Sequence, residues 1–373
     1  MSELPIFKRP LTDQPNSAFT LPSAYYLNDD IFELEKEKIF YRSWQYVAHR
    51  CMLSKSGDYI TLQIGDENIF VIHSADGEFR AFYNVCKHRA HQLLEGTGNV
   101  RKLIVCPYHA WSYDDQGSLK LARMSEHRSG FDKESFGLTE VRLETLCGCL
   151  FVNLDNKADS LVDTVPGLET DIRKHLSYID EIELCGTDLM GETMISSGWK
   201  VVIDNYVECY HCRPAHPDFS SIIDMNQYQV DLHKNWSRQY GPEIRHENSA
   251  YPVDPEKGIQ NSIFWYMWPN TTFNVMPGSN EFAVFAVRPI DVGKCTFGGQ
   301  NFAVDAELYQ PRVDYVADIL APEDIKLCES VQRGLKSKSY DQGCFMVDPN
   351  KPGESEHALH QFHQQVYRAL SED

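Results

Sequence analysis

The sequence predicts an α+β protein, in which a small all-β domain precedes a larger domain of antiparallel strands and helices. Residues 40–155 consist of short alternating apolar segments separated by turn-forming residues. A polar stretch at 155–160, Asp-Asn-Lys-Ala-Asp-Ser, ends this pattern. Beyond it, helical spacing of apolar residues alternates with aromatic-rich strands. We therefore expect three regions, at 1–39, 40–155 and 156–373.

The first region, residues 1–39, is expected to form a surface arm followed by a helix. Its beginning is polar and rich in Pro, Ser and Asn, whereas the apolar residues between Asp30 and Phe40 recur at helical intervals. The region has no signal-peptide core, and no run in the chain approaches the roughly eighteen apolar residues of a membrane span. We therefore expect a cytoplasmic protein without a membrane-spanning segment.

Short strands are expected throughout the all-β domain. The tripeptide Ala75-Asp76-Gly77 predicts a tight turn between two of them. The strands are expected at residues 59–64, 68–73, 80–85, 103–105, 111–113 and 149–154.

The larger domain is expected to mix helices with strands. Helices are expected at 166–178, from 199 to about 211, and at 322–336, with strands near 263–290 and 295–305.

The charge balance limits the partners. The 373 residues include 35 Lys and Arg and 54 Asp and Glu, which gives a formal net charge of −19. Nucleic acid is excluded because phosphate binding needs a basic surface, whereas a small cationic substrate is compatible with this charge. Of eleven cysteines, two lie in the metal motif described next. The other nine are scattered, as is typical of reduced thiols.

The first candidate metal site is a pair of mixed Cys and His motifs. Cys86-x-His88 is followed, after seventeen residues, by Cys106-x-x-His109. A Rieske-type [2Fe–2S] cluster needs this set, with two thiolates on one iron and two imidazoles on the other. A structural zinc ion is the alternative, although its usual pattern pairs Cys with Cys and His with His. The spacing therefore favours the cluster.

The second candidate metal site lies between residues 199 and 217. On a helix, Asp204, Glu208 and His211 would share one face. Pro214 would stop or bend that helix, which would let His216 converge with His211 on one ion. A single carboxylate would complete a 2-His-1-carboxylate site for Fe(II). Asp324 is a candidate, but acids in the first turn of a helix also occur for capping alone.

Two neighbouring patterns allow more than one interpretation. Cys209-x-x-Cys212 could be a redox motif, but no βαβ pattern precedes it. The aromatic segment with Trp265, Trp268 and Phe273 could belong to the core, or could bind an alkylammonium ion through cation–π attraction. Candidate residues for such a pocket are Tyr206, Trp265, Trp268, Phe273 and Asn274.

These motifs resemble those of the Rieske oxygenases, and the similarity runs from about residue 20 to 368. In that family an acid is followed by His three residues later, by His after five more, and by a distant Asp. The resemblance implies that His211, His216 and Asp324 bind a mononuclear Fe(II). It implies that Cys86, His88, Cys106 and His109 bind a [2Fe–2S] cluster.

The resemblance also implies an assembly and a mechanism. The catalytic domain would have the helix-grip fold, and the chain would form a homotrimer served by a flavin and iron–sulfur NAD(P)H reductase. Glu208 would carry electrons between subunits by contacting the neighbouring cluster histidine. Many aromatic-ring dioxygenases have Asp at that position, and often Gly where this chain has Ala90. Glu208, preceded by Asp204-Asn205-Tyr206, resembles the branch that oxidises quaternary ammonium compounds.

Three functions stay open. The first is a monooxygenase that uses O₂ to hydroxylate, demethylate or cleave a carnitine-, betaine- or choline-like ammonium compound, with Glu208, Asp204 and Asn205 as candidate catalytic residues. The second is the α subunit of an aromatic-ring dioxygenase. The third is an electron carrier without catalysis, which would leave the His-His-Asp set without a role.

Overall fold

A computed structural model of the chain describes residues 4–185, 192–304 and 306–372. The chain divides into two compact units. Phe40–Leu161 forms the first, called the β unit here, and Met1–Ile39 together with Val162–Asp373 forms the second, called the α+β unit. The arm and helix at the N-terminus therefore belong to the second unit, and residues 156–161 belong to the first.

The β unit contains only antiparallel strand pairs. A seven-stranded sheet has the order β1-β10-β9-β4-β3-β2-β5, and a second sheet has the order β6-β7-β8. The predicted turn at Ala75-Asp76-Gly77 joins β3 to β4, with Gly77 at a φ of +89°. The strands are β1 Gln45–His49, β2 Asp58–Ile64, β3 Glu67–His73, β4 Phe79–Tyr83, β5 Thr97–Asn99, β6 Ile104–Val105, β7 Ser112–Tyr113, β8 Leu119–Leu121, β9 Glu140–Leu146 and β10 Cys149–Asn153.

The α+β unit is built on a sheet that has eight strands in the described part of the chain. Its order is β11-β18-β17-β16-β15-β14-β13, and β12 also pairs with β18. The strands are β11 Glu183–Leu184, β12 Glu192–Ile195, β13 Gln229–His233, β14 Trp236–Gly241, β15 Ser262–Met267, β16 Thr271–Val275, β17 Glu281–Asp291 and β18 Lys294–Ala303. Together the two units confirm the α+β prediction.

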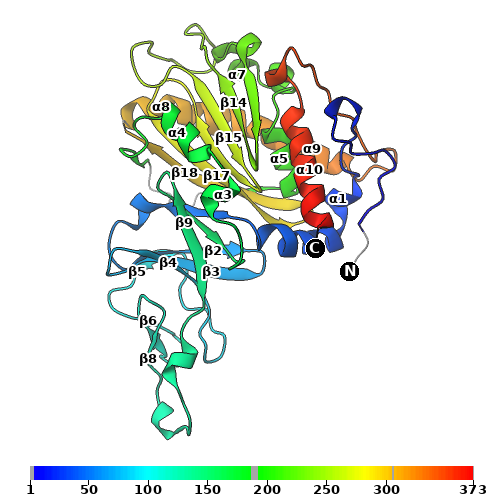
Figure 1. The fold of residues 1–373 in the computed structure, drawn as a ribbon. Helices are drawn as coiled ribbons and strands as arrows, with labels where there is room; N and C mark the ends of the chain where they lie inside the picture. The colour runs from blue at the N-terminus through cyan, green and yellow to red at the C-terminus, as the bar shows by residue number, and fades with distance from the viewer. Residues whose placement is uncertain (1–3, 186–191, 305, 373) are drawn as a thin grey trace. The chain divides into compact units, whose positions relative to one another are not determined.

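The helices belong to the α+β unit or border it. α5 contacts both α9 and α10, which are drawn near it in Figure 1. Cys328 Sγ on α9 donates to Val201 O on α5 (3.9 Å), and the rings of Trp199 on α5 and Phe362 on α10 are 5.7 Å apart. No helix in the described ranges is long and apolar enough to cross a membrane. The helices are α1 Ala24–Leu27, α2 Asp29–Glu35, α3 Leu161–Thr164, α4 Leu168–His175, α5 Trp199–Tyr206, α6 Cys212–Ala215, α7 Pro217–Ile222, α8 Ala306–Tyr315, α9 Ala321–Gly334 and α10 His357–Ser371.

One helix boundary differs from the prediction. α5 ends at Tyr206 rather than near His211, and Pro214 lies inside the short helix α6 instead of ending a longer one. The helix predicted at 322–336 is α9, Ala321–Gly334. It is preceded without a break by α8 and a π-helical segment, η7 Val316–Leu320.

The sheet separates residues that the sequence had grouped together. Side chains alternate between the two faces of a strand, and Trp265 pairs with Phe273 whereas Phe264 pairs with Asn274. The Trp265 indole donates to Asp171 on α4 (2.8 Å), while Asn274 accepts from Tyr206 on α5 (2.8 Å). α4 and α5 therefore cover opposite faces.

Candidate metal centres and family

The first candidate site is made by two loops with the same backbone geometry. In the loop after β4, Cys86 N donates to His91 O (2.8 Å) and Ala90 N to Cys86 O (3.0 Å). In the loop between β6 and β7, Cys106 N donates to Trp111 O (2.8 Å) and Ala110 N to Cys106 O (3.0 Å). Each loop thus turns back on itself directly beside its cysteine and histidine.

Both loops contain an alanine in the left-handed region, Ala90 at a φ of +56° and Ala110 at +60°. This conformation costs an L-residue roughly 1–2 kcal/mol, and glycine adopts it freely. The family's frequent glycine at the position of Ala90 therefore has a conformational reason, and this chain accepts the strain at that position.

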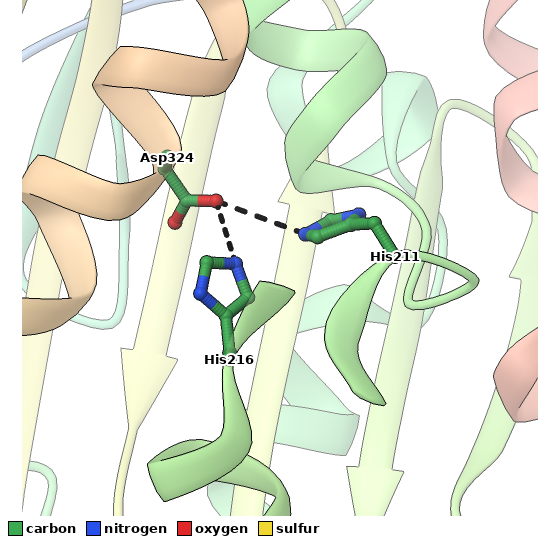
Figure 2. A group of neighbouring side chains, drawn as sticks. All are labelled: His211, His216 and Asp324. Carbon is green, nitrogen blue, oxygen red and sulfur yellow. Dashed lines mark hydrogen bonds and ion pairs between the residues drawn. The ribbon is translucent and has the colours of Figure 1, made fainter. Parts of the chain in front are cut away.

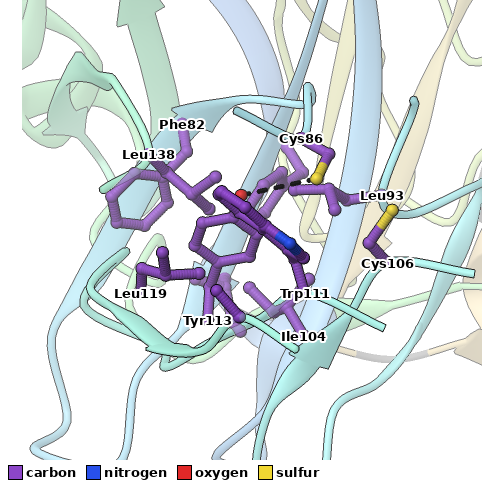
Figure 3. Packing of buried hydrophobic residues seen from close by; sticks show 12 residues of the cluster. Phe82, Cys86, Leu93, Ile104, Cys106, Trp111, Tyr113, Leu119 and Leu138 are labelled. Carbon is purple, nitrogen blue, oxygen red and sulfur yellow. Dashed lines mark hydrogen bonds between the residues drawn. The ribbon is translucent and has the colours of Figure 1, made fainter. Parts of the chain in front are cut away.

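The two thiols lie inside an apolar cluster of the β unit. Cys86 and Cys106 are each 2% exposed, and both lie at one edge of the packed side chains in Figure 3. Lys87 N donates to the Tyr113 hydroxyl oxygen (3.0 Å), and the same hydroxyl lies 3.4 Å from Cys86 Sγ. A metal-bound thiolate can only accept, so the hydroxyl would donate to it in the loaded site. Burial raises the pKa of the Cys86 thiol, and a bound metal ion would offset this by stabilising the thiolate.

The two histidines of this site lie nearer to solvent. His88 is exposed and stacks on Trp111, with its ring 4.7 Å from that of His109. His109 Nδ1 is buried and has no hydrogen-bond partner among the described residues. Two buried thiols, two outer imidazoles and an orphaned ring nitrogen fit a [2Fe–2S] cluster with His ligands on the outer iron.

A cavity of about 580 Å³ lies beside the two histidines. It has basic residues in its lining although the chain as a whole carries a charge of −19. Exposed apolar side chains occur on the same loops and sheet, among them Val105, Tyr108 and Met124. The basic residues in the lining are Lys87, Arg123 and Arg128.

The second candidate site brings together His211, His216 and Asp324, as Figure 2 shows. One donor atom from each lies within 4.8 Å of the others. His216 Nε2 is 2.9 Å and His211 Nε2 is 3.7 Å from Asp324 Oδ1. Two imidazoles and one carboxylate on one side of a space fit the facial set that binds Fe(II).

Each of these residues comes from a different local structure. His211 lies in the loop after α5, His216 lies between α6 and α7, and Asp324 lies on α9. Asn205, on the last turn of α5, donates to Asp324 Oδ1 (2.7 Å). Tertiary packing therefore brings together what the sequence places more than a hundred residues apart.

Glu208 and His211 are in contact because both lie in one turn of the chain, and not because they share a face of a helix. Its carboxylate accepts hydrogen bonds from the backbone N–H groups of Tyr210 and His211 and contacts His211 Nδ1. A disulfide between Cys209 and Cys212 closes the same turn, with a Cα–Cα distance of 4.9 Å. The expectation of reduced thiols was wrong for this pair.

Asp204 points away from this group. It accepts from the Tyr26 hydroxyl (2.7 Å) and contacts His363 Nε2 (3.1 Å). Leu21 N donates to His363 Nδ1 (3.0 Å), so the ring hydrogen must lie on Nε2, where it is donated to Asp204. Asp204 thus joins the N-terminal arm to α10, and its predicted place beside Glu208 on a helical face was wrong.

The aromatic candidates divide between core and site. Trp265 and Phe273 are fully buried on the α4 face, where Phe273 stacks on Phe282. Trp268 packs against Phe362. Tyr206 and Asn274 lie on the α5 face and bond to each other, and burial raises the pKa of Tyr206 well above its usual value. Trp265 and Phe273 therefore have the placement of core residues.

Glu323 was not among the predicted site residues, yet its carboxylate contacts the other nitrogen of His216 (Nδ1 to Oε2, 2.7 Å). Burial lowers the pKa of His216, but the hydrogen bonds and charges of Asp324 and Glu323 outweigh this effect and raise it. Surroundings that stabilise a positive charge on His216 also suit a bound cation. The sequence feature that could have pointed to Glu323 is its place directly before the candidate ligand Asp324.

Comparison with known proteins agrees with both sites. Residues 43–132 match the Rieske [2Fe-2S] domain, and residues 191–372 match the ring hydroxylating alpha subunit (catalytic domain). The carnitine monooxygenase oxygenase subunit of Acinetobacter baumannii is 39% identical over 93% of this chain and 94% of its own length. The corresponding subunit of Escherichia coli K12 is 38% identical over 94% of this chain and 93% of its own length.

Solved structures give the same result. The quaternary ammonium Rieske monooxygenase CntA in complex with L-carnitine has a TM-score of 0.87 and 36% identity, and 99% of each chain is covered. Naphthalene 1,2-dioxygenase from Rhodococcus shares the fold, with a TM-score of 0.79, 19% identity and 95% of each chain covered. The chain therefore belongs to the Rieske oxygenases of the carnitine monooxygenase oxygenase-subunit family.

Proposed function

We propose that this protein is the oxygenase component of a monooxygenase that oxidises a trimethylammonium compound of the carnitine type. Similarity to carnitine-bound CntA over nearly the whole chain carries this proposal. O₂, two electrons and two protons would convert a C–H bond next to the charged nitrogen into C–OH, with the second oxygen leaving as water. Collapse of that product would release trimethylamine and a carbonyl compound.

We assign His211, His216 and Asp324 as ligands of the mononuclear iron, and Cys86, His88, Cys106 and His109 as ligands of the cluster. When bound, the mononuclear iron supplies the place where O₂ is activated. Asn205 orients the Asp324 carboxylate through its 2.7 Å hydrogen bond. Glu208 orients His211 from the opposite side of the imidazole ring.

The charge around the mononuclear site supports a cationic substrate. Glu208, Glu323 and Asp324 contact the two histidines. Three carboxylates exceed the charge of a divalent ion, so the loaded site keeps an excess of negative charge. An alkylammonium ion would be attracted to it and an anionic ligand repelled.

Aromatic residues on the site's own side of the sheet supply the apolar part. One buried cluster contains residues that flank His211, His216 and the helix of Asp324, such as Cys212, Phe219 and Tyr315. Its rings include the pairs Phe219–Phe264 at 5.8 Å and Tyr251–Tyr315 at 5.6 Å. We assign cation–π binding to this cluster in place of Trp265 and Phe273.

Oxygen uptake by the iron-loaded protein with a surrogate reductase tests the proposal. The substrates would be carnitine, γ-butyrobetaine, choline, glycine betaine, proline betaine and a simple arene. We expect O₂ consumption coupled to trimethylamine release with carnitine or γ-butyrobetaine, and none in His216→Ala. Turnover of the arene alone would mean a ring dioxygenase, and two rather than three irons per chain would mean an electron carrier.

We propose further that the active form is a homotrimer, in which Glu208 of one copy lies against a cluster histidine of the next, and that a separate NAD(P)H reductase delivers the electrons. Exposed His88, the basic cavity beside it and the exposed apolar residues support a partner surface there. Co-expression of Cys86→Ala with His216→Ala tests the transfer between copies. Each variant alone should be inactive, and mixed oligomers should regain activity unless electrons stay within one chain.

A further inference from the structure

The two proposed histidine ligands are held in the same way at both ring nitrogens. Each ring turns Nε2 toward Asp324 Oδ1, at 2.9 Å for His216 and 3.7 Å for His211. Each ring turns Nδ1 toward a glutamate, Glu208 for His211 and Glu323 for His216. Glu208 is the proposed link between copies, whereas Glu323 has been assigned only a share of the negative charge of the site.

We propose that Glu323 is the positioning residue of the mononuclear iron site: its carboxylate accepts the Nδ1 hydrogen of His216 and thereby keeps Nε2 free to bind the metal. This inference rests on the ligands assigned above. Adjacent residues of α9, Glu323 and Asp324, contact the two nitrogens of the same imidazole. The orientation of the His216 ring is thus fixed at both nitrogens by two residues of the same turn of α9.

The physical reason lies in the tautomer. A neutral imidazole binds a metal through one nitrogen and carries its hydrogen on the other, and the hydrogen-bond acceptor decides which one. Glu323 Oε2 is 2.7 Å from His216 Nδ1, and the His216 side chain is only 2% exposed. The negative charge of this acceptor also makes Nε2 a stronger ligand.

A purely structural role as a helix-capping acid does not fit Glu323. Such a role needs free N–H groups at a helix start. α9 has no such start, because α8, η7 and α9 follow one another without a break from Ala306 to Gly334 and Ala321 N donates to Val316 O. Glu323 therefore lies inside a long helical segment, one turn beyond its π-helical part, and its carboxylate is directed to His216.

Metal affinity of the full chain, with its cluster in place, tests the inference without any substrate. The mononuclear site would be emptied and titrated with Fe(II) and Co(II). We expect Glu323→Ala to bind both ions 10–100-fold more weakly than wild type. The affinity of Glu323→Gln should lie between those of wild type and Glu323→Ala, because its amide oxygen still accepts a hydrogen bond but carries no charge. Asp318→Asn, which removes an exposed charge from η7, is the matched control and should bind as wild type.

The Co(II) absorption spectrum and the thermal unfolding of the metal-free protein separate positioning from folding. Glu323→Ala should change the Co(II) spectrum while the cluster spectrum and the melting temperature stay those of wild type. Wild-type affinity in Glu323→Ala, or a loss of affinity that follows only from unfolding, would overturn the inference. A wild-type chain that binds no ion in this site would overturn the proposed function itself.

Discussion

Asn205 donates a hydrogen bond from Nδ2 to Oδ1 of Asp324 across 2.7 Å, which joins the last turn of α5 to α9 at a proposed iron ligand. Substitution of Asn205 by Leu keeps the size of the side chain and removes the donor. We expect roughly 10–100-fold weaker Fe(II) binding, because the ligand carboxylate loses its orientation. Iron content after dialysis measures the effect, and a wild-type content would contradict it. The [2Fe–2S] absorption should not change.

Glu208→Gln tests the proposed link between copies. The amide oxygen can still accept from the backbone N–H groups of Tyr210 and His211, so the turn should be kept and the cluster should load as in wild type. The contact with His211 Nδ1 loses its charged acceptor, so Fe(II) is supplied in excess until both proteins contain equal iron. The missing charge should slow electron delivery to the mononuclear site. A single-turnover experiment with pre-reduced protein and excess substrate measures this rate. Product formation at the wild-type rate would remove Glu208 from the electron path.

Tyr113→Phe should lower the reduction potential of the cluster. The Tyr113 hydroxyl lies 3.4 Å from Cys86 Sγ and would donate to that sulfur once it is a cluster thiolate, and such a bond stabilises the more negative, reduced form. A redox titration followed by the reduced-cluster EPR signal gives the potential. Tyr83→Phe removes a hydroxyl from β4 instead of from the cluster loops and is the control. An unchanged potential in Tyr113→Phe would show that this hydroxyl does not tune the cluster.

Ala90→Gly and Ala110→Gly should each stabilise the protein. Both alanines have positive φ, which costs an L-residue roughly 1–2 kcal/mol. Part of that gain is offset because glycine raises the entropy of the unfolded chain by the equivalent of about 0.4–1 kcal/mol. We expect a net gain of about 0–1.6 kcal/mol at each position, measured as a higher melting temperature of the cluster-loaded protein. Ala90→Val should instead lower it.

Glu356 should make stability depend on pH. Burial, with the charges of Glu208 and Asp204, raises its pKa from 4.5 to about 7. The folded state then binds this proton more tightly than the unfolded state, so its contribution is full below about pH 4.5 and is lost as the pH rises to about 7.

Denaturant unfolding of the protein without mononuclear iron, at several pH values in that window, measures the effect. Glu356→Gln should flatten the decline relative to wild type. Glu37→Gln removes an exposed carboxylate from the η2 segment, Lys36–Phe40, and should leave the slope as it is. Equal slopes in wild type and Glu356→Gln would contradict the assignment of the shift to Glu356.

The sequence by itself determined the chemistry of the two metal sites. Cys86, His88, Cys106 and His109 could be paired from spacing because each pair lies within one short loop, where local turn geometry decides what can converge. The turn between β3 and β4 could be predicted for the same reason. Residues that are close in the sequence are held close in space by the backbone, so their proximity can be predicted from a single sequence.

Only the tertiary structure decided what depends on distant segments. Which face of the sheet Trp265 and Phe273 occupy follows from how α4 and α5 pack, and not from alternation within β15 and β16. The same packing turns Asp204 toward Tyr26 and His363, ends α5 before Glu208, and brings Glu323 to His216 across 107 residues of sequence. Such contacts depend on burial and packing summed over the whole unit, and these have no counterpart in residue spacing.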